Sequence, residues 1–321
     1  MEKVVRCDEN KINRKKIFPE NSLFKYRGGN SKKMKPFVSV CTPTYNRRPF
    51  LDAMFRCFKS QDYPMDRMEW VIVDDGTDCI EDLVKAAALP QIKYVRLPNR
   101  VTLGRKRNLM HAQCTGDILV YMDDDDYYPP TRVSHAVEML QQHPEALAVG
   151  SSVLHIYFKH LDKIVEFGPY GPRHATAGTF AFRKALLQQT AYDDTATTGE
   201  EKTFLKNYSI PLVQLDPRRV ILCFSHDHNT FDKRVLLQNP ARTVLRETDL
   251  RVSDFIQDAG LADFYVHQLP DALRHYDAGR KEFSVRVGHR VLMGNEILDH
   301  LNQQQAYIRK LETRIKELLR R

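Results

Sequence analysis

Short apolar runs alternate with helical patterns over the first part of this chain, and this alternation limits the folds open to it. Four runs are typical of strands, at residues 37–43, 69–77, 92–98 and 118–122. Three helical segments separate them, at residues 47–61, 79–89 and 103–114. Strands that alternate with helices in this way pair in parallel, because each helix carries the chain back along the sheet. We therefore expect an α/β fold with a mixed, mostly parallel sheet flanked by helices.

The fourth of these runs, Ile118–Met122, leads directly into four aspartates, Asp123–Asp126. Its β-branched and aromatic residues are typical of a strand buried on both faces. Four like charges this close together repel one another unless solvent or a cation compensates them. A solvated acidic turn is one interpretation. The other is a divalent metal with oxygen ligands, because ligand sites form at the carboxyl ends of strands in such sheets.

The composition is that of a globular protein, with 42% hydrophobic and 28% charged residues over 321 positions. No apolar run approaches the ~20 residues of a membrane span, and the first residues lack the apolar segment of a signal peptide. The six cysteines form no CxxC pair, which favours reduced core thiols in a cytoplasmic protein. The net charge of +8 is concentrated at the two ends. This argues against nucleic acid as the main partner and leaves peripheral contact with membranes open.

Changes of pattern along the chain predict four segments. Residues 1–35 form a basic polar leader, with eleven Lys or Arg against four Asp or Glu. Residues 36–232 form the α/β domain, and residues 233–296 form a helical extension. Residues 297–321 form a helix with a heptad pattern, at Ile297, Leu301, Gln304, Ile308, Leu311, Ile315 and Leu318. Ile at one core position and Leu at the other favours a parallel two-stranded coiled coil, so we expect a homo-oligomer, a dimer. Packing of this helix on its own subunit is the alternative.

Four motifs, in the same order, carry a resemblance to a known family. They are VSVCTPTYNRRPFL at residues 38–51, EWVIVDDGT at 69–77, GRKRN with GDILVYMDDDDYYPP at 104–130, and GEEKTFL at 199–205. Together they resemble family 2 glycosyltransferases of the Rossmann-like GT-A fold, over roughly residues 37–230. The chain has neither the G-x-G-x-x-G of a dinucleotide site nor a P-loop. A nucleotide bound here without a glycine cradle would need a metal for its phosphates.

The resemblance implies a role for each matching position. The residues that it places on the nucleotide-sugar are Pro43, Thr44, Tyr45, Arg47, Asp75, Arg105, Asp123 and Asp124. Asp123 and Asp125 match the metal-binding DxD motif of the family. Asp74 and Asp126 are interpreted instead as residues that cap turns or helix starts. Arg107 is interpreted equally as a phosphate contact or as part of a solvated basic face.

An acidic pair, Glu200-Glu201, matches the position where the family carries its catalytic base. The family commonly has Glu-Asp here, and its second member takes the proton from the acceptor hydroxyl. We therefore expect Glu201 to be the base and keep Glu200 as the alternative. Carboxylates in the first turn of a helix can also simply stabilise that helix, which is the structural interpretation.

Two histidines, His226 and His228, follow the apolar run VILCF and flank Asp227. Alternate positions on an extended chain point to the same side. Many GT-A enzymes complete the metal site with a histidine from this later segment, so the resemblance implies that one of these two binds the metal. A shell of carboxylate and imidazole ligands favours Mn²⁺, with Mg²⁺ as the alternative.

These observations predict a metal-dependent, inverting glycosyltransferase. Its donor would be a nucleotide-sugar, first of all a UDP-sugar, and its acceptor a hydroxyl on a glycan, a protein or a lipid. Two other functions fit parts of the pattern. A metal-dependent nucleotidyl- or phosphotransferase could use the same acidic edge, and a non-catalytic GT-A-like scaffold could act through its C-terminal coiled coil.

Overall fold

The computed structural model describes residues 34–197, 199–238, 244–279, 284–287, 290–293 and 295–319. The chain divides into residues 1–34 and a larger unit, residues 35–321. The predicted basic leader, residues 1–35, lies outside the described residues except for its last two. No helix in the described segments is both long and apolar enough to cross a bilayer.

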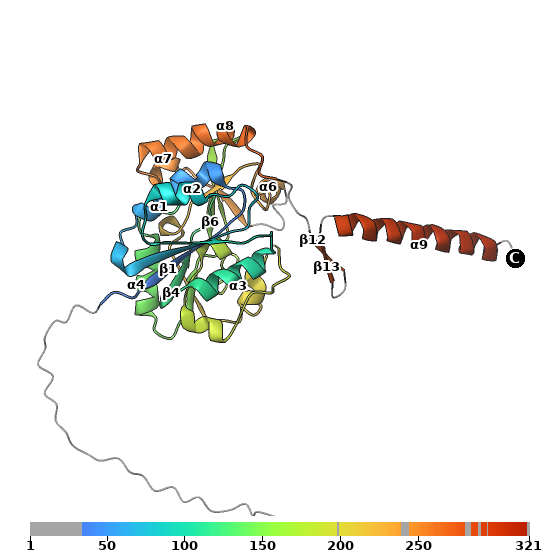
Figure 1. The fold of residues 1–321 in the computed structure, drawn as a ribbon, viewed down its shortest axis with the longest axis horizontal. Helices are drawn as coiled ribbons and strands as arrows, with labels where there is room; N and C mark the ends of the chain where they lie inside the picture. Colours follow the sequence, from blue (N-terminus) through green and yellow to red (C-terminus); the bar gives the residue numbers. More distant parts are fainter. Residues whose placement is uncertain are drawn as a thin grey trace, which may run out of the picture. The chain divides into compact units, whose positions relative to one another are not determined.

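A seven-stranded sheet forms the centre of the larger unit, in the order β3-β2-β1-β4-β8-β5-β9 (Figure 1). Its strands are β1 (Val38–Thr44), β2 (Met68–Asp74), β3 (Ile92–Arg96), β4 (Ile118–Tyr121), β5 (Ala148–Gly150), β8 (Ala181–Arg183) and β9 (Leu212–Gln214). β1 pairs in parallel with β2 and β4, and β2 pairs in parallel with β3. β8 runs antiparallel between β4 and β5. The predicted mixed, mostly parallel sheet is therefore confirmed.

Helices cover both faces of this sheet, because alternate strand residues point to opposite sides. They are α1 (Leu51–Lys59), α2 (Glu81–Ala87), α3 (Leu103–Gln113), α4 (Arg132–Gln142) and α5 (Glu201–Phe204). Val38 and Val40 of β1 lie in one apolar core with residues of α1 and α4. Cys41 lies in a second core with residues of α3 and α5. This burial on both faces explains why the strands are continuous apolar runs in the sequence.

Trp70 of β2, the single tryptophan of the chain, fixes the first of these cores. Its side chain is fully buried and stacks on Phe58 of α1, with 4.5 Å between ring centroids. The indole Nε1 donates to Thr42 Oγ1 at 2.9 Å, so its polar atom is also satisfied inside the core. α1 is thereby held against β1 and β2, whose carboxyl ends carry the first polar motifs.

A second, four-stranded sheet has the order β10-β6-β7-β11. Its strands are β6 (Leu154–Phe158), β7 (Lys163–Phe167), β10 (Cys223–Ser225) and β11 (Leu245–Glu247). β11 pairs antiparallel with β7, although the surrounding sequence predicts helix. A short strand gains its stability from the neighbour that it pairs with, and periodicity within its own three residues cannot reveal that neighbour.

The region predicted as a helical extension, residues 233–296, is helical only in part. Its helices are α6 (Val235–Gln238), α7 (Ala259–Asp263) and α8 (Leu269–Arg274), with a π-helical turn, Phe264–Gln268, between the last two. β11 and an antiparallel hairpin of β12 (Ser284–Val287) and β13 (Arg290–Met293) also lie here. β12 alternates valine with polar residues, which favours strand over helix.

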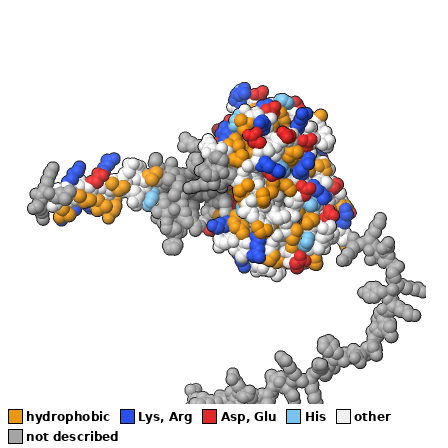
Figure 2. Space-filling view, turned by 180° about the vertical axis from the view of Figure 1, so that it is seen from behind, with side chains coloured by type: hydrophobic (Ala, Val, Ile, Leu, Met, Phe, Trp, Pro, Cys, Tyr) orange, Lys and Arg blue, Asp and Glu red, His pale blue; other side chains and the backbone are white. Residues whose placement is uncertain are grey.

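The predicted C-terminal helix is confirmed as α9 (Asn295–Leu319). Its heptad positions from Leu301 to Leu318 are solvent-exposed within the described residues, for example Leu301 at 54% and Leu311 at 44%. Figure 2 shows hydrophobic side chains along one side of this helix and charged side chains along the other. Pairing with a second copy stays a prediction.

Candidate active site

The carboxyl ends of β1, β2 and β4 meet at one edge of the central sheet. Thr44, at the end of β1, pairs with Asp74, at the end of β2. The backbone N–H of Met122, which follows β4, donates to Cys41 of β1 at 3.1 Å. Three motifs that are far apart in the sequence therefore come together here, as the parallel pattern predicts.

Asp74 and Asp75 are adjacent in sequence but make different contacts. Asp74 accepts hydrogen bonds from the Gly76 backbone N–H at 2.8 Å and from the Tyr94 hydroxyl at 2.6 Å. Arg96 lies 3.4 Å from the same carboxylate. These contacts are internal to β2, β3 and the turn that follows β2, so Asp74 stabilises the turn, as its interpretation as a capping residue implies.

Asp75 faces the end of β1 and is paired with Lys106 of α3. Its second oxygen accepts from the Val101 backbone N–H at 2.9 Å. Lys106 also donates to the Thr44 carbonyl oxygen at 2.9 Å, and burial lowers the pKa of its amine. Lys106 was not predicted from the sequence. The Asp75 carboxylate is thus held at the edge by a buried cation from the neighbouring helix.

The residues after β1 lie beside this pair. The Tyr45 ring centroid is 3.8 Å from the guanidinium carbon of Arg100 and 5.8 Å from the Lys106 amine. Pro43 and Thr44 occupy the last two positions of β1 and are buried. The three residues predicted to line a nucleotide base are therefore next to Asp75, which is predicted to bind the same base.

The four consecutive aspartates do not form a solvated turn, because each carboxylate lies beside a basic side chain of the fold. Asp124 lies 3.4 Å from the Arg47 guanidinium, and Asp125 lies 3.4 Å from His226 Nε2. Asp125 also accepts from the Asn229 side-chain amide at 3.2 Å. The structure thus brings Asp124 and Asp125 together with Arg47, which lies 3.8 Å from Asp125.

The outer two aspartates have distinct surroundings. Asp126 accepts from the Phe224 backbone N–H at 2.9 Å and from Lys233 at 3.2 Å, which ties the run to β10. Asp123 is the most exposed of the four aspartates, with 27% of its side chain accessible. A Cβ at Gly178 would lie 2.7 Å from the Asp123 carboxylate, so glycine is needed there for this close approach.

Burial and mutual repulsion set the charge of this run. Burial raises the pKa of Asp124 to about 7 and that of Asp126 to about 6, with neighbouring carboxylates adding to the effect. Burial acts on Asp125 in the same direction, but the His226 hydrogen bond and the nearby cations Lys233 and Arg47 together lower its pKa. Without a bound cation, the edge holds more negative charge than its own basic residues compensate.

Arg107 of α3 connects the aspartate run to the acidic pair. Its Nε donates to Glu200 at 2.9 Å, and its guanidinium lies 3.7 Å from Asp123. The Tyr121 ring is 4.7 Å from the guanidinium carbon, and Arg107 is almost fully buried. Arg105, which was predicted to contact the nucleotide-sugar, is exposed on the same helix. Helical spacing separates them, because residues two apart point in different directions.

Glu200 and Glu201 are adjacent in sequence but differ in whether their carboxylates are paired. Glu200 is buried and paired with Arg107. The Glu201 carboxylate has no side-chain hydrogen bond or ion pair among the described residues. Burial and the neighbouring Glu200 raise its pKa. α5 is only four residues long because Lys206, Asn207 and Tyr208 adopt positive φ, so the pair sits at the start of a short helix.

The two histidines are also placed differently. His226 lies beside Asp125, and its Nδ1 is buried without a hydrogen-bond partner in the described part of the chain. His228 contacts the site through its backbone carbonyl, which accepts from Arg47 at 2.7 Å. Within the described residues no three His, Cys, Asp or Glu side chains are clustered closely enough to hold a metal by themselves. Of the predicted metal ligands, the structure brings Asp125 and His226 together, 3.4 Å apart; Asp123 and phosphate oxygens of a bound nucleotide would have to complete the shell of a divalent metal.

Residues 39–197 match the model of the family described as glycosyl transferase family 2. An undecaprenyl-phosphate 4-deoxy-4-formamido-L-arabinose transferase of Pseudomonas syringae is 31% identical over 118 residues, which are 34% of this chain and 35% of that protein. The poly(ribitol-phosphate) β-N-acetylglucosaminyltransferase TarS of Staphylococcus aureus is 30% identical over 108 residues, 33% of this chain and 19% of TarS. This chain thus spans about a third or less of the length of these relatives.

A solved structure supports the fold independently. The mannosyltransferase PcManGT of Pyrobaculum calidifontis, in complex with GDP-Man and Mn²⁺, superposes with a TM-score of 0.50 and 21% identity. The match covers 64% of this chain and 62% of that one. The predicted GT-A fold is therefore confirmed, and the predicted resemblance to glycosyl transferase family 2 is confirmed over residues 39–197.

Proposed function

We propose that this protein transfers a sugar from a nucleotide-sugar to an acceptor hydroxyl, with inversion at the anomeric carbon. The observation that carries this proposal is the pair Glu200-Glu201. Glu200 is neutralised by Arg107 at 2.9 Å, whereas Glu201 has a raised pKa and no partner among the described residues. A carboxylate of this kind is suited to accept a proton from a hydroxyl at neutral pH.

The donor would lie along the carboxyl edge of the sheet. Tyr45 and Asp75 lie at the end proposed for the nucleotide base, and Asp123–Asp126 lie at the end proposed for the phosphates. Asp123, Asp125 and His226 would hold a divalent metal, for which Mn²⁺ is the first choice because imidazole joins the carboxylates. A metal bound there supplies positive charge to the diphosphate leaving group. That PcManGT is named in complex with Mn²⁺ and a nucleotide-sugar supports this arrangement.

Individual residues of this chain then have separate roles in the reaction. Glu201 accepts the proton of the acceptor hydroxyl as its oxygen attacks the anomeric carbon from the face opposite the leaving group. Arg107 fixes Glu200 and keeps the two glutamates from sharing one proton. Arg47, 3.4 Å from Asp124, is placed to contact phosphate oxygens directly.

A panel of nucleotide-sugars, UDP-sugars first, tests this proposal with Mn²⁺ present and release of nucleoside diphosphate as the readout. Glu201→Gln keeps the shape of the side chain and removes the base, so transfer should fall by at least about a hundredfold. Glu145→Gln, in an exposed glutamate away from the site, is the matched control and should be unchanged. Transfer by Glu201→Gln at the wild-type rate would refute the role of this residue.

The same assay separates the two other candidate functions. A nucleotidyl- or phosphotransferase would release pyrophosphate or phosphate in place of a nucleoside diphosphate. A non-catalytic scaffold would release neither from any donor, and its function would be insensitive to both glutamates. The paired state of Glu200 and the raised pKa of Glu201 favour an enzyme over the scaffold.

We also propose that α9 pairs with the α9 of a second copy. Its heptad positions are exposed and follow the 3.5-residue period of a left-handed coiled coil, with Ile308 and Ile315 at one core position and Leu311 and Leu318 at the other. The acceptor class and the cytoplasmic location stay predictions. In support of the latter, the five cysteines within the described residues are free thiols.

A further inference from the structure

A cavity lies next to Asp125 and Asp126, on the side of the four-stranded sheet. Its volume is about 510 Å³, which lies within the range of small-ligand sites. β6, β10, the segment 226–234 and α8 surround it. None of Pro43, Tyr45 or Asp75, the residues at the proposed nucleotide end, lines it. The cavity is therefore separate from the part of the edge that is proposed to hold the base.

Two side chains of the lining directly contact the aspartate run. His226 lies 3.4 Å from Asp125, and the Tyr265 hydroxyl donates to the Asp126 carbonyl oxygen at 3.0 Å. A molecule in the cavity is thus one side chain away from the proposed phosphate and metal position. An acceptor bound here would extend past His226 to bring its reacting hydroxyl to Glu201, which does not line the cavity.

The floor of the cavity is aromatic and rigid. Phe224 and Tyr265 stack with 4.4 Å between ring centroids, and Tyr157 lies 5.6 Å from Phe224. The hydroxyls of both tyrosines are already bonded, that of Tyr157 to Asp162 at 2.7 Å. The rings consequently offer carbon surface, which suits the C–H faces of a sugar or polyol.

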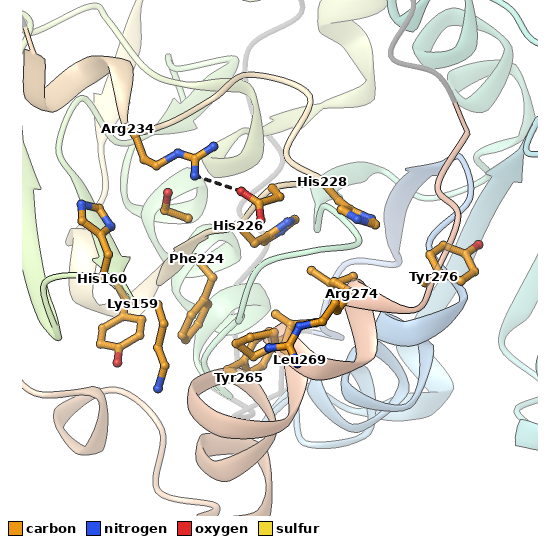
Figure 3. A pocket seen from close by; sticks show the side chains of 15 residues that line it. Lys159, His160, Phe224, His226, His228, Arg234, Tyr265, Leu269, Arg274 and Tyr276 are labelled. Atoms are coloured by element: carbon orange, nitrogen blue, oxygen red, sulfur yellow. Dashed lines mark hydrogen bonds and ion pairs between the residues drawn. The ribbon is translucent and has the colours of Figure 1, made fainter.

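The rim of the cavity is basic, in contrast to the acidic edge beside it. Lys159, Arg234 and Arg274 line it together with three histidines, and Asp227 is the acidic residue of the lining. Figure 3 shows Lys159 and His160 on one side of the cavity, and Arg274 and Tyr276 on the other.

The basic residues of the rim differ in how far they are neutralised. Arg234 is paired with Asp227 at 2.9 Å, and Arg274 is paired with Asp271 at 2.9 Å. The Lys159 ammonium has no hydrogen bond or ion pair in the part of the chain that the structure describes. One uncompensated ammonium beside an aromatic floor is therefore available to an anionic ligand without any metal.

We propose that this cavity binds the acceptor, and that the acceptor is a sugar or polyol that carries a phosphate or a carboxylate. Lys159 contacts the anionic group, and the Phe224–Tyr265 floor contacts the carbon skeleton. This inference rests on the proposed function, which it extends by naming the chemical class of the acceptor.

Calorimetric titration of the full chain tests the proposal, with glucose 6-phosphate, glucuronate and glucose as probes. At least one of the two anionic probes should bind about tenfold more tightly than glucose, and comparison of the two identifies phosphate or carboxylate as the anion. Lys159→Gln should weaken that binding by about tenfold, as expected for the loss of one charge-assisted contact. Lys59→Gln, in an exposed lysine at the end of α1, is the matched control and should have no effect.

The titrations are repeated with saturating UDP and Mn²⁺ to locate the probe. Undiminished binding of the anionic probe supports a separate acceptor cavity, whereas its displacement by UDP overturns the proposal. Equal affinity for glucose and both anions, or unchanged binding by Lys159→Gln, overturns it as well. Hydrolysis of a nucleotide-sugar by water, measured in the wild type without acceptor, reports on the proposed function separately.

Discussion

Replacement of Arg107 by methionine should strongly destabilise the fold, because this arginine compensates a buried acidic side chain. The guanidinium is 4% exposed, and so is the Glu200 carboxylate that it binds at 2.9 Å. Methionine fills a similar volume but leaves that carboxylate in an apolar environment, beside Tyr121 and Tyr192. Removal of one partner of a buried ion pair typically costs about 3–5 kcal/mol, which is a large part of the stability of an ordinary domain.

Urea unfolding, followed by the fluorescence of Trp70, measures this loss, since Trp70 is fully buried and is the single tryptophan. Arg105→Met is the matched control on the same helix. Its side chain is exposed, so the free energy of unfolding should change by less than about 0.5 kcal/mol.

The loss should come from the charge that is left on Glu200. The double variant Arg107→Met with Glu200→Gln should therefore recover part of the loss, because that charge is absent. A loss below about 1 kcal/mol, or no recovery in the double variant, would refute this account of Arg107.

The remaining predictions concern catalysis and assembly. Because the pKa of Glu201 is raised, kcat/KM for transfer should fall on the acid side at a pH above the ordinary glutamate value of 4.5, as the base becomes protonated; a rate that stays constant down to that value contradicts the assignment. Removal of divalent metal with a chelator should abolish transfer, and added Mn²⁺ should restore it; full activity in the chelator argues against the metal. Ile308→Asp with Ile315→Asp should convert a dimer to a monomer in light scattering, whereas Lys310→Gln, off the heptad positions, should not; a monomeric wild type refutes the coiled coil.

The sequence by itself determined the architecture around the central sheet. Continuous apolar runs such as Ile118–Met122 predict strands buried on both faces, and the helical segments between them require parallel pairing. The aspartate run could be located at the carboxyl edge for the same reason. The long heptad of α9 was also predictable, since it repeats over several turns. These features depend on patterns within a few consecutive residues.

The tertiary structure alone decided which charged residues compensate one another. Arg107 and Glu200 are 93 positions apart, and Lys106 and Asp75 are 31 apart, so no local pattern distinguishes these basic residues from Arg105. β11 likewise forms a strand because it pairs with the edge strand β7. Helical phase and strand order fix which side chains meet, and both are set by packing of the whole domain. For this reason the acidic edge could be predicted, whereas the buried cations that balance part of it, and the basic cavity beside it, could not.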